Sequence, residues 1–215
     1  MSQRDPNADG EVLSGGTPLD EAVAIAIAIH GRGATAQSIL QLVAQADRSD
    51  GDIAYLAPQA TRATWYPRSF LAPPEHNQPY LDSALSTVER VMQMALGQVS
   101  ADRVAIVGFS QGGCLASEFV ARNPRRYGGL FAFSGGLIGD EVDTDRYAGS
   151  LDGSPVYLGC SDIDPHIPVE RVHETADVFE MLDGEVTTDI FPGMGHTVNA
   201  DELEQLSKRF EQLTA

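Results

Sequence analysis

A serine between two glycines, in the segment Gly108-Phe109-Ser110-Gln111-Gly112, carries the clearest chemical signal of this chain. An apolar, β-branched run precedes it and an Ala- and Leu-containing segment follows it, as expected for a strand that turns sharply into a helix. The glycines let two backbone segments approach closely, and the serine at the apex projects its hydroxyl away from the fold. Ser110 is therefore the candidate nucleophile for acyl transfer.

A serine hydroxyl needs a neighbouring base, and the chain has five histidines. His196 is the candidate, because it lies in a glycine-rich loop between the last expected strand and the last expected helix. A histidine late in the chain suits the order serine, acid, histidine that accompanies such a turn. The alternative for His196 is a surface histidine or one that caps a helix.

Two aspartates compete for the role of the acid that orients the histidine. Asp162 and Asp164 both lie on the loop after the penultimate expected strand. The acid must reach the imidazole by a hydrogen bond, which fixes the tautomer and stabilises the imidazolium. Either aspartate can do this, and either can instead serve a turn or cap the next helix. The residues alone leave the choice open.

Backbone N–H groups near the serine form the expected oxyanion hole. One belongs to Gln111, and the other comes from the loop His30-Gly31-Arg32-Gly33, whose glycines let the Arg32 amide face the site. Each such donor contributes about 2.7–4 kcal/mol in the transition state. The alternative is a plain strand-to-helix turn. A phosphate-binding loop is a further alternative, but the segment lacks the spacing and the Lys-Ser/Thr of a P-loop.

Buried strands alternate with amphipathic helices around these residues. The expected strands cover 22–29, 53–57, 104–109, 129–133, 156–159 and 186–191, and the expected helices cover 35–46, 80–97, 113–122, 168–182 and 200–213. This alternation is typical of an α/β fold, with a mostly parallel sheet between two layers of helices. Ligands of such sheets bind beyond the carboxyl ends of the strands.

A length of 215 residues suits a single domain, which we expect over residues 13–215. The polar residues 1–12 lack the apolar core of a signal peptide and are expected to form a disordered lead. No apolar run approaches the roughly 20 residues that cross a bilayer. Two cysteines are too few for a disulfide framework, so we expect a cytoplasmic protein with reduced thiols.

Acidic residues outnumber basic ones, with 31 Asp and Glu against 14 Lys and Arg, a net charge of −17 and Lys208 as the single lysine. Such a surface repels nucleic acid and anionic lipid, so we expect no nucleic-acid partner and no stable membrane association. The balance favours a halophilic protein, because molar salt shortens the Debye length to about 3 Å and screens the self-repulsion. The alternative is an ordinary acidic protein.

Five segments of the chain, taken in order, resemble the phospholipase/carboxylesterase family of small α/β-hydrolases, which includes acyl-protein thioesterases and bacterial carboxylesterases. They are His30-Gly-Arg-Gly33, Ala57-Pro-Gln-Ala60 followed by Trp65-Tyr66, Gly108-Phe-Ser-Gln-Gly-Gly113, Asp164-Pro-His-Ile-Pro168 and Gly193-Met-Gly-His196. The similarity extends over residues 20–213 and implies an α/β-hydrolase fold. We expect no large lid domain, because the sequence leaves no room for one.

The resemblance also implies a role for each candidate residue. It makes Ser110 the nucleophile, Asp164 rather than Asp162 the acid, and His196 the base. The oxyanion donors are those at Arg32 and Gln111, as the residues themselves suggest.

The chain departs from the family pattern at two positions. Ser161 stands where many relatives carry glycine, and we expect it to alter the approach to Asp164. Arg32 stands where many relatives carry an apolar residue. Its guanidinium either pairs with a substrate carboxylate in the pocket or pairs outward with one of the many acids.

The long loop 58–79 carries most of the expected substrate-binding residues. Trp65, Tyr66 and Phe70, stiffened by prolines, suit the wall of an acyl or aromatic pocket, or alternatively a cap over the sheet edge. His166, in the turn that carries the candidate acids, is the fourth expected substrate-binding residue.

The expected activity is that of a carboxylesterase-type serine hydrolase (EC 3.1.1) acting on small esters or thioesters, with no metal and no cofactor. Lysophospholipase and acyl-protein thioesterase are the alternative activities. A protein of a different class, one that binds without catalysis on a hydrolase fold, is a further alternative. A homodimer is compatible with the resemblance, because relatives form homodimers.

Overall fold

Seven strands form one sheet, in the order β1-β3-β2-β4-β5-β6-β7, in the computed structural model, which describes residues 6–7, 10–49 and 51–215. Neighbouring strands are parallel except β1 and β3, which are antiparallel. The strands are β1 (Val12–Gly16), β2 (Ala24–Ile29), β3 (Ile53–Pro58), β4 (Val104–Phe109), β5 (Gly129–Phe133), β6 (Pro155–Ser161) and β7 (Glu185–Phe191). The mostly parallel sheet predicted from the sequence is confirmed.

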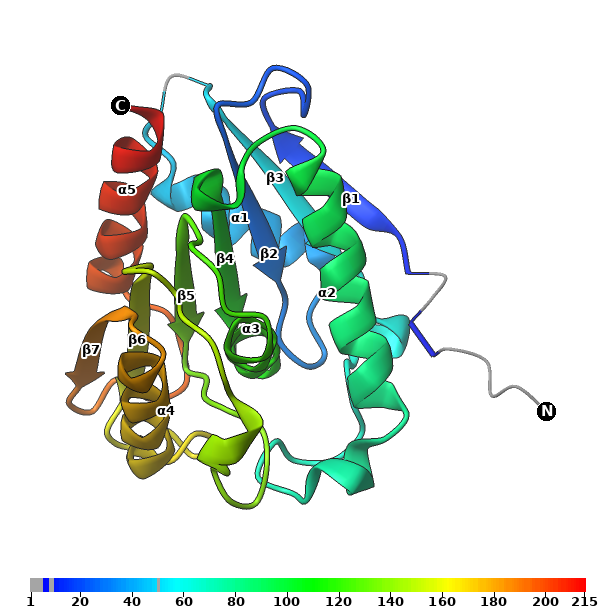
Figure 1. The fold of residues 1–215 in the computed structure, drawn as a ribbon, viewed down its shortest axis with the longest axis vertical. Coiled ribbons are helices and arrows are strands. Elements are labelled where there is room, and N and C mark those ends of the chain that lie inside the picture. Colours follow the sequence, from blue (N-terminus) through cyan, green and yellow to red (C-terminus); the bar gives the residue numbers. More distant parts are fainter. Residues whose placement is uncertain (1–5, 8–9, 50) are drawn as a thin grey trace.

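Helices cover both faces of this sheet, as predicted. In Figure 1, α2, α3 and α4 lie on the face toward the viewer, and α1 and α5 pack on the other face. The helices are α1 (Ala36–Ala46), α2 (Tyr80–Leu96), α3 (Gln111–Arg122), α4 (Val169–Met181) and α5 (Ala200–Thr214). The described residues also form short 3₁₀ helices, η1 (Thr61–Ala63), η2 (Pro74–Asn77), η3 (Ala101–Arg103) and η4 (Thr144–Arg146).

The central strand β2 contributes to two cores, one on each face of the sheet. Its residues alternate between alanine and isoleucine, and all of them are buried. Ile25, Ile27 and Ile29 belong to the core under α2, α3 and α4, whereas the alanines face α1 and α5, because successive side chains of a strand point to opposite faces. Complete burial of one isoleucine contributes about 1.5–3 kcal/mol. The sheet that carries the site is therefore held from both sides.

The N-terminal segment differs from the prediction of a disordered lead over residues 1–12. Asn7 is buried, its backbone N–H donates to Ser83 Oγ at 2.8 Å, and its Oδ1 accepts from the Thr61 N–H at 3.1 Å. Strand β1 begins at Val12, so the prediction is wrong for 6–7 and 10–12, while 1–5 and 8–9 lie outside the described residues. The sequence of β1, Val-Leu-Ser-Gly-Gly, has no alternation of apolar and polar residues, and pairing with distant β3 creates the strand.

The carboxyl ends of the parallel strands all point to one end of the molecule, the lower end in Figure 1. The segments after β2, β4, β6 and β7 therefore meet there, and they carry Arg32, Ser110, Asp164 and His196. Within the described part of the chain, no helix combines the length and apolar character needed to cross a bilayer.

Candidate active site

Ser110 occupies a sharp turn between β4 and α3 in which only glycine fits at two positions. Its backbone angles are φ 56° and ψ −122°, a conformation that L residues rarely adopt and that is associated with functional sites. A Cβ on Gly108 would lie 2.3 Å from the Gly112 carbonyl oxygen, and a Cβ on Gly112 would lie 2.0 Å from that of Ile29. The strained serine is thus held by close backbone packing on both sides.

His196 lies between Ser110 and Asp164 and is within hydrogen-bond distance of both. Its Nε2 is 2.9 Å from Ser110 Oγ, and its Nδ1 is 2.7 Å from Asp164 Oδ2. The carboxylate holds a proton on Nδ1, which leaves Nε2 free to accept the serine proton. His196 comes from the loop between β7 and α5, so three loops at one sheet edge supply the three side chains.

Asp164 is buried but well supplied with hydrogen-bond donors. Its side chain is 0% exposed, and its Oδ1 accepts from the backbone N–H groups of His166 at 2.8 Å and Ile167 at 3.1 Å. Burial raises the pKa of this carboxyl, but the hydrogen bonds from His196 and the two amides outweigh burial and leave the pKa below its ordinary value. Asp164 is therefore ionised where it faces the imidazole.

The neighbours Ser161 and Asp162 hold the loop that carries His196. Asp162 Oδ1 accepts from the Gly193 N–H at 2.7 Å, and Ser161 Oγ accepts from the Gly195 N–H at 3.0 Å. Of the two aspartates that the residues left open, Asp164 contacts the imidazole and Asp162 tethers its loop. The sequence analysis did not predict these two hydrogen bonds. Two polar residues at the end of one strand, beside a Gly-x-Gly loop that follows the neighbouring strand, could have indicated them.

Two backbone N–H groups beside Ser110 are free to stabilise an oxyanion. Within the described residues, the amides of Gln111 and Arg32 have no hydrogen-bond acceptor in the protein. Gln111 opens α3, where the first N–H groups have no partner inside the helix. The Arg32 loop lies against the turn, since a Cβ on Gly31 would be 3.3 Å from Ser110 Cβ. Both predicted donors thus border the nucleophile.

Buried His30 supports this loop. Its Nδ1–H donates to the Gly31 carbonyl at 2.7 Å, and its Nε2 accepts from the Ala60 N–H at 3.1 Å. Burial lowers the pKa of His30, so the ring is neutral and keeps this tautomer. Trp65 Nε1–H donates to the His30 carbonyl at 2.8 Å. The sequence placed His30 at a strand end, with no indication of these bonds.

A cavity of about 400 Å³ opens beside Ser110. Tyr66, Phe70 and His166, three of the four residues predicted to bind substrate, line it. Trp65 does not: its side chain is 0% exposed and packs against His30, so its predicted contact with substrate is wrong. The remaining lining residues are Arg32, Pro67, Arg68, Ser69, Ser110, Gln111, Cys114, Ile167 and His196.

The Arg32 side chain pairs with none of the described acidic residues, contrary to one of the two expectations. Its guanidinium donates to the carbonyls of Tyr66 at 2.9 Å, Pro67 at 3.2 Å and Arg68 at 2.8 Å. Gln111 adds to this tie, because its Nε2–H donates to the Tyr66 carbonyl at 2.8 Å. The long loop is thereby fixed across the mouth of the cavity.

Over the described residues, no three His, Cys, Asp or Glu side chains are grouped to hold a metal ion.

Known proteins match this chain over most of its length. A family model described as Phospholipase/Carboxylesterase matches residues 11–214. A solved phospholipase/carboxylesterase from Dyadobacter fermentans is 39% identical, with a TM-score of 0.90, and the match covers 94% of this chain and 97% of that one.

Curated relatives match over shorter stretches. Acyl-protein thioesterase 1 of Kluyveromyces lactis is 28% identical over 130 residues, 59% of this chain and 57% of the relative. A probable carboxylesterase of Arabidopsis thaliana is 30% identical over 118 residues, 54% of this chain and 44% of the relative. The chain thus spans about half the length of these two relatives.

Proposed function

The chain belongs to the phospholipase/carboxylesterase family, and on that basis we propose that it is a carboxylesterase-type serine hydrolase that cleaves small esters through an acyl-enzyme on Ser110. One observation carries the proposal: Ser110 Oγ, His196 and Asp164 form a continuous hydrogen-bonded chain of 2.9 and 2.7 Å at the edge of a cavity. This is the geometry that an activated serine nucleophile requires.

In the first half of the reaction, Ser110 Oγ attacks the ester carbonyl while His196 Nε2 takes the serine proton. The carbonyl oxygen becomes an oxyanion and accepts from the N–H groups of Gln111 and Arg32. Ionised Asp164 stabilises the imidazolium. The tetrahedral intermediate then collapses, and the alcohol leaves with the proton that His196 returns to it.

In the second half, water replaces the alcohol. His196 removes a proton from the water, whose oxygen attacks the acyl-enzyme, and the same two amides hold the new oxyanion. Collapse releases the carboxylic acid and returns the proton to Ser110.

Thioester hydrolysis is the second candidate, because a thiol can leave by the same steps, with the proton that His196 returns to it, and a relative is named an acyl-protein thioesterase. A lysophospholipase acting at an anionic membrane is disfavoured by the net charge of −17. A protein that binds without catalysis is also disfavoured, since the nucleophile, base and acid are all present and in contact. We propose that the protein acts in the cytoplasm. That it forms a homodimer and that it is adapted to high salt are also predictions.

Labelling with a fluorophosphonate probe tests the proposal. The intact protein should be labelled on Ser110, and Ser110→Ala should lose both the label and about 10⁴-fold or more of the hydrolysis of 4-nitrophenyl butyrate. Ser86→Ala, an exposed serine on α2, is the matched control and should behave like the intact protein. An intact protein that never labels and never hydrolyses the ester would refute the proposed function.

A further inference from the structure

The cavity at Ser110 is positively charged in a strongly acidic protein. Arg32 and Arg68 line it, and among the described residues no Asp or Glu belongs to its lining. The whole chain, by contrast, has 31 acidic and 14 basic residues. The charge of the cavity lining is therefore opposite in sign to the net charge of the chain.

Both arginines keep their charge unpaired. Among the described residues, neither Arg32 nor Arg68 has a carboxylate within ion-pair distance. Other arginines do find acids, as Arg48 does with Glu204 at 2.6 Å. Several other described arginines, Arg62 and Arg126 among them, also lack an ion pair, so what distinguishes Arg32 and Arg68 is that both line the cavity at Ser110, where a ligand can reach them.

The three hydrogen bonds of Arg32 position its guanidinium without neutralising it. Its acceptors are the carbonyls of residues 66–68, which are uncharged. A guanidinium has five N–H donors, so two remain after these bonds. Holding the group in place reduces the entropy lost when a ligand binds. Arg32 is thus prepared to bind an oxyanion beside the nucleophile.

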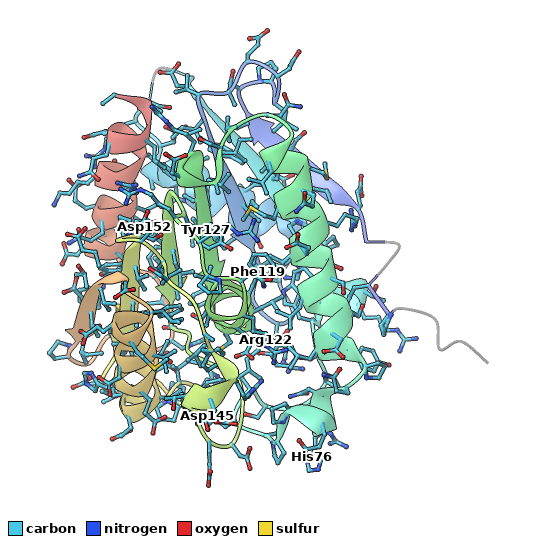
Figure 2. All side chains as sticks on the ribbon, in the orientation of Figure 1. His76, Phe119, Arg122, Tyr127, Asp145 and Asp152 are labelled. Carbon is cyan, nitrogen blue, oxygen red and sulfur yellow. The ribbon has the colours of Figure 1, made fainter. Side chains whose placement is uncertain are left out.

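The Arg68 side chain also borders a second hollow, farther from Ser110. This hollow shares Arg68 and Ser69 with the cavity and adds His76. His76 lies at the end of the molecule beyond the carboxyl ends of the strands (Figure 2). The Arg68 side chain stands between the two hollows and has no acceptor within the described part of the chain.

We propose that the ester cleaved at Ser110 carries an oxyanionic group, a carboxylate or a phosphate, that Arg32 and Arg68 bind at the cavity mouth. This inference rests on the proposed function and adds the substrate class. A guanidinium binds such a group through charge-assisted, often bidentate, hydrogen bonds. Local positive charge is also what lets an anion approach a surface that otherwise repels it.

Matched pairs of esters test the inference and distinguish the two sides of the ester bond. For the acyl side, the 4-nitrophenyl monoester of adipic acid is compared with 4-nitrophenyl methyl adipate. For the alcohol side, 4-butyryloxybenzoate is compared with its methyl ester. In at least one pair, the intact protein should prefer the anionic ester by about tenfold or more in kcat/KM. A phosphate-bearing aryl butyrate extends the second pair.

Variants assign that preference to the arginines. Arg68→Gln should reduce the ratio of anionic to neutral kcat/KM to near one, whatever it does to either rate alone. Arg62→Gln removes an equal charge from the same loop without touching either hollow, and it should keep the ratio. Free adipate should inhibit neutral-ester hydrolysis competitively in the intact protein and more weakly in Arg68→Gln.

Two outcomes overturn the inference in different ways. If neutral esters are hydrolysed and Ser110 is labelled, but no anionic ester is preferred in either pair, the proposed function stands and the anionic substrate class is wrong. If the protein labels with no probe and hydrolyses no ester, the proposed function itself fails. A preference that Arg68→Gln leaves intact also contradicts the inference, because another group would then bind the anion.

Discussion

Ser110 and His196 lie 2.9 Å apart, but the segments that carry them are held in different ways. At the Ser110 turn, backbone packs against backbone so closely that Gly108 and Gly112 have no room for a Cβ. The loop 192–198 around His196 is half-buried or exposed. In the part of the chain that the structure describes, no atom lies within 4 Å of a Cβ built on Gly193 or Gly195.

Hydrogen bonds from the end of β6 replace packing at the His196 loop. Gly193 and Gly195 have φ of 69° and 79°, which turns their N–H groups toward Asp162 and Ser161. The position of the nucleophile thus depends on contacts that the whole fold shares, while that of the base depends on a few side chains. A substitution that disrupts packing at the Ser110 turn should reduce the stability of the fold, whereas one that releases the His196 loop should reduce activity.

Gly112→Ala should have the largest effect, on stability. Its Cβ would lie 2.0 Å from the Ile29 carbonyl oxygen and 2.7 Å from that of His30, both backbone atoms of the central sheet edge. Such overlap cannot be relieved without moving β2 against α3, and we expect a loss of about 3 kcal/mol or more. Urea unfolding followed by circular dichroism measures it.

Gly97→Ala is the matched control for this substitution. Gly97 follows α2 with φ −69°, and a Cβ there would lie an ordinary 3.4 Å from the Met94 carbonyl oxygen. Its stability should stay near that of the intact protein. A Gly112→Ala protein as stable as the Gly97→Ala protein would show that the turn is looser than its packing indicates.

The same contrast explains what could be predicted from the sequence. The turn at Ser110 was accessible because its signal is local: an apolar run, two glycines at fixed spacing and a helical segment. The tethers of the His196 loop were not, since they join residues about thirty positions apart. Asp162 and Asp164 differ in the direction that their side chains face. The family resemblance implied that Asp164 is the acid, whereas the residues alone did not distinguish the two.

Misses elsewhere have similar physical causes. Strand β1 has no apolar alternation and depends on pairing with β3. A tryptophan in this loop could line a cavity or fill the core, and the sequence does not distinguish the two. In the structure Trp65 is fully buried and belongs to the core. For Arg32, the expected pairing with an acid is not found among the described residues, because nothing in a sequence reveals three converging carbonyl groups.

The far end of the His196 loop predicts a dependence of stability on pH. Glu202 closes the capping box of α5 with Asn199, and its wholly buried Oε1 has no partner within the described residues. Burial raises the pKa of Glu202 from 4.5 to about 7. The unfolded chain therefore releases this proton first, and the folded state loses stability as pH rises from 4.5 through 7, by up to about 3 kcal/mol.

Glu202→Gln removes this titration. Its free energy of unfolding relative to the intact protein should increase between pH 5 and pH 8, as measured by urea unfolding at each pH. Glu204→Gln, two residues further on, is the control: Glu204 is exposed and pairs with Arg48, so it should show no such gain. If the Glu202→Gln difference is the same at both pH values, this buried carboxyl does not titrate in the folded state near neutrality.

Asp162→Ala should give the smallest change in free energy but the clearest separation of activity from stability. It removes one acceptor at the protein surface, which costs the fold about 1 kcal/mol, and it releases the Gly193 N–H that holds the His196 loop. His196 then spends less time within reach of Ser110, so kcat should fall about tenfold. KM should change little, because Asp162 does not line the cavity. Asp162→Asn keeps an acceptor oxygen and should recover most of kcat. An Asp162→Ala protein with unchanged kcat would mean that packing alone holds the base, as it holds the nucleophile, and the contrast between the two segments would disappear.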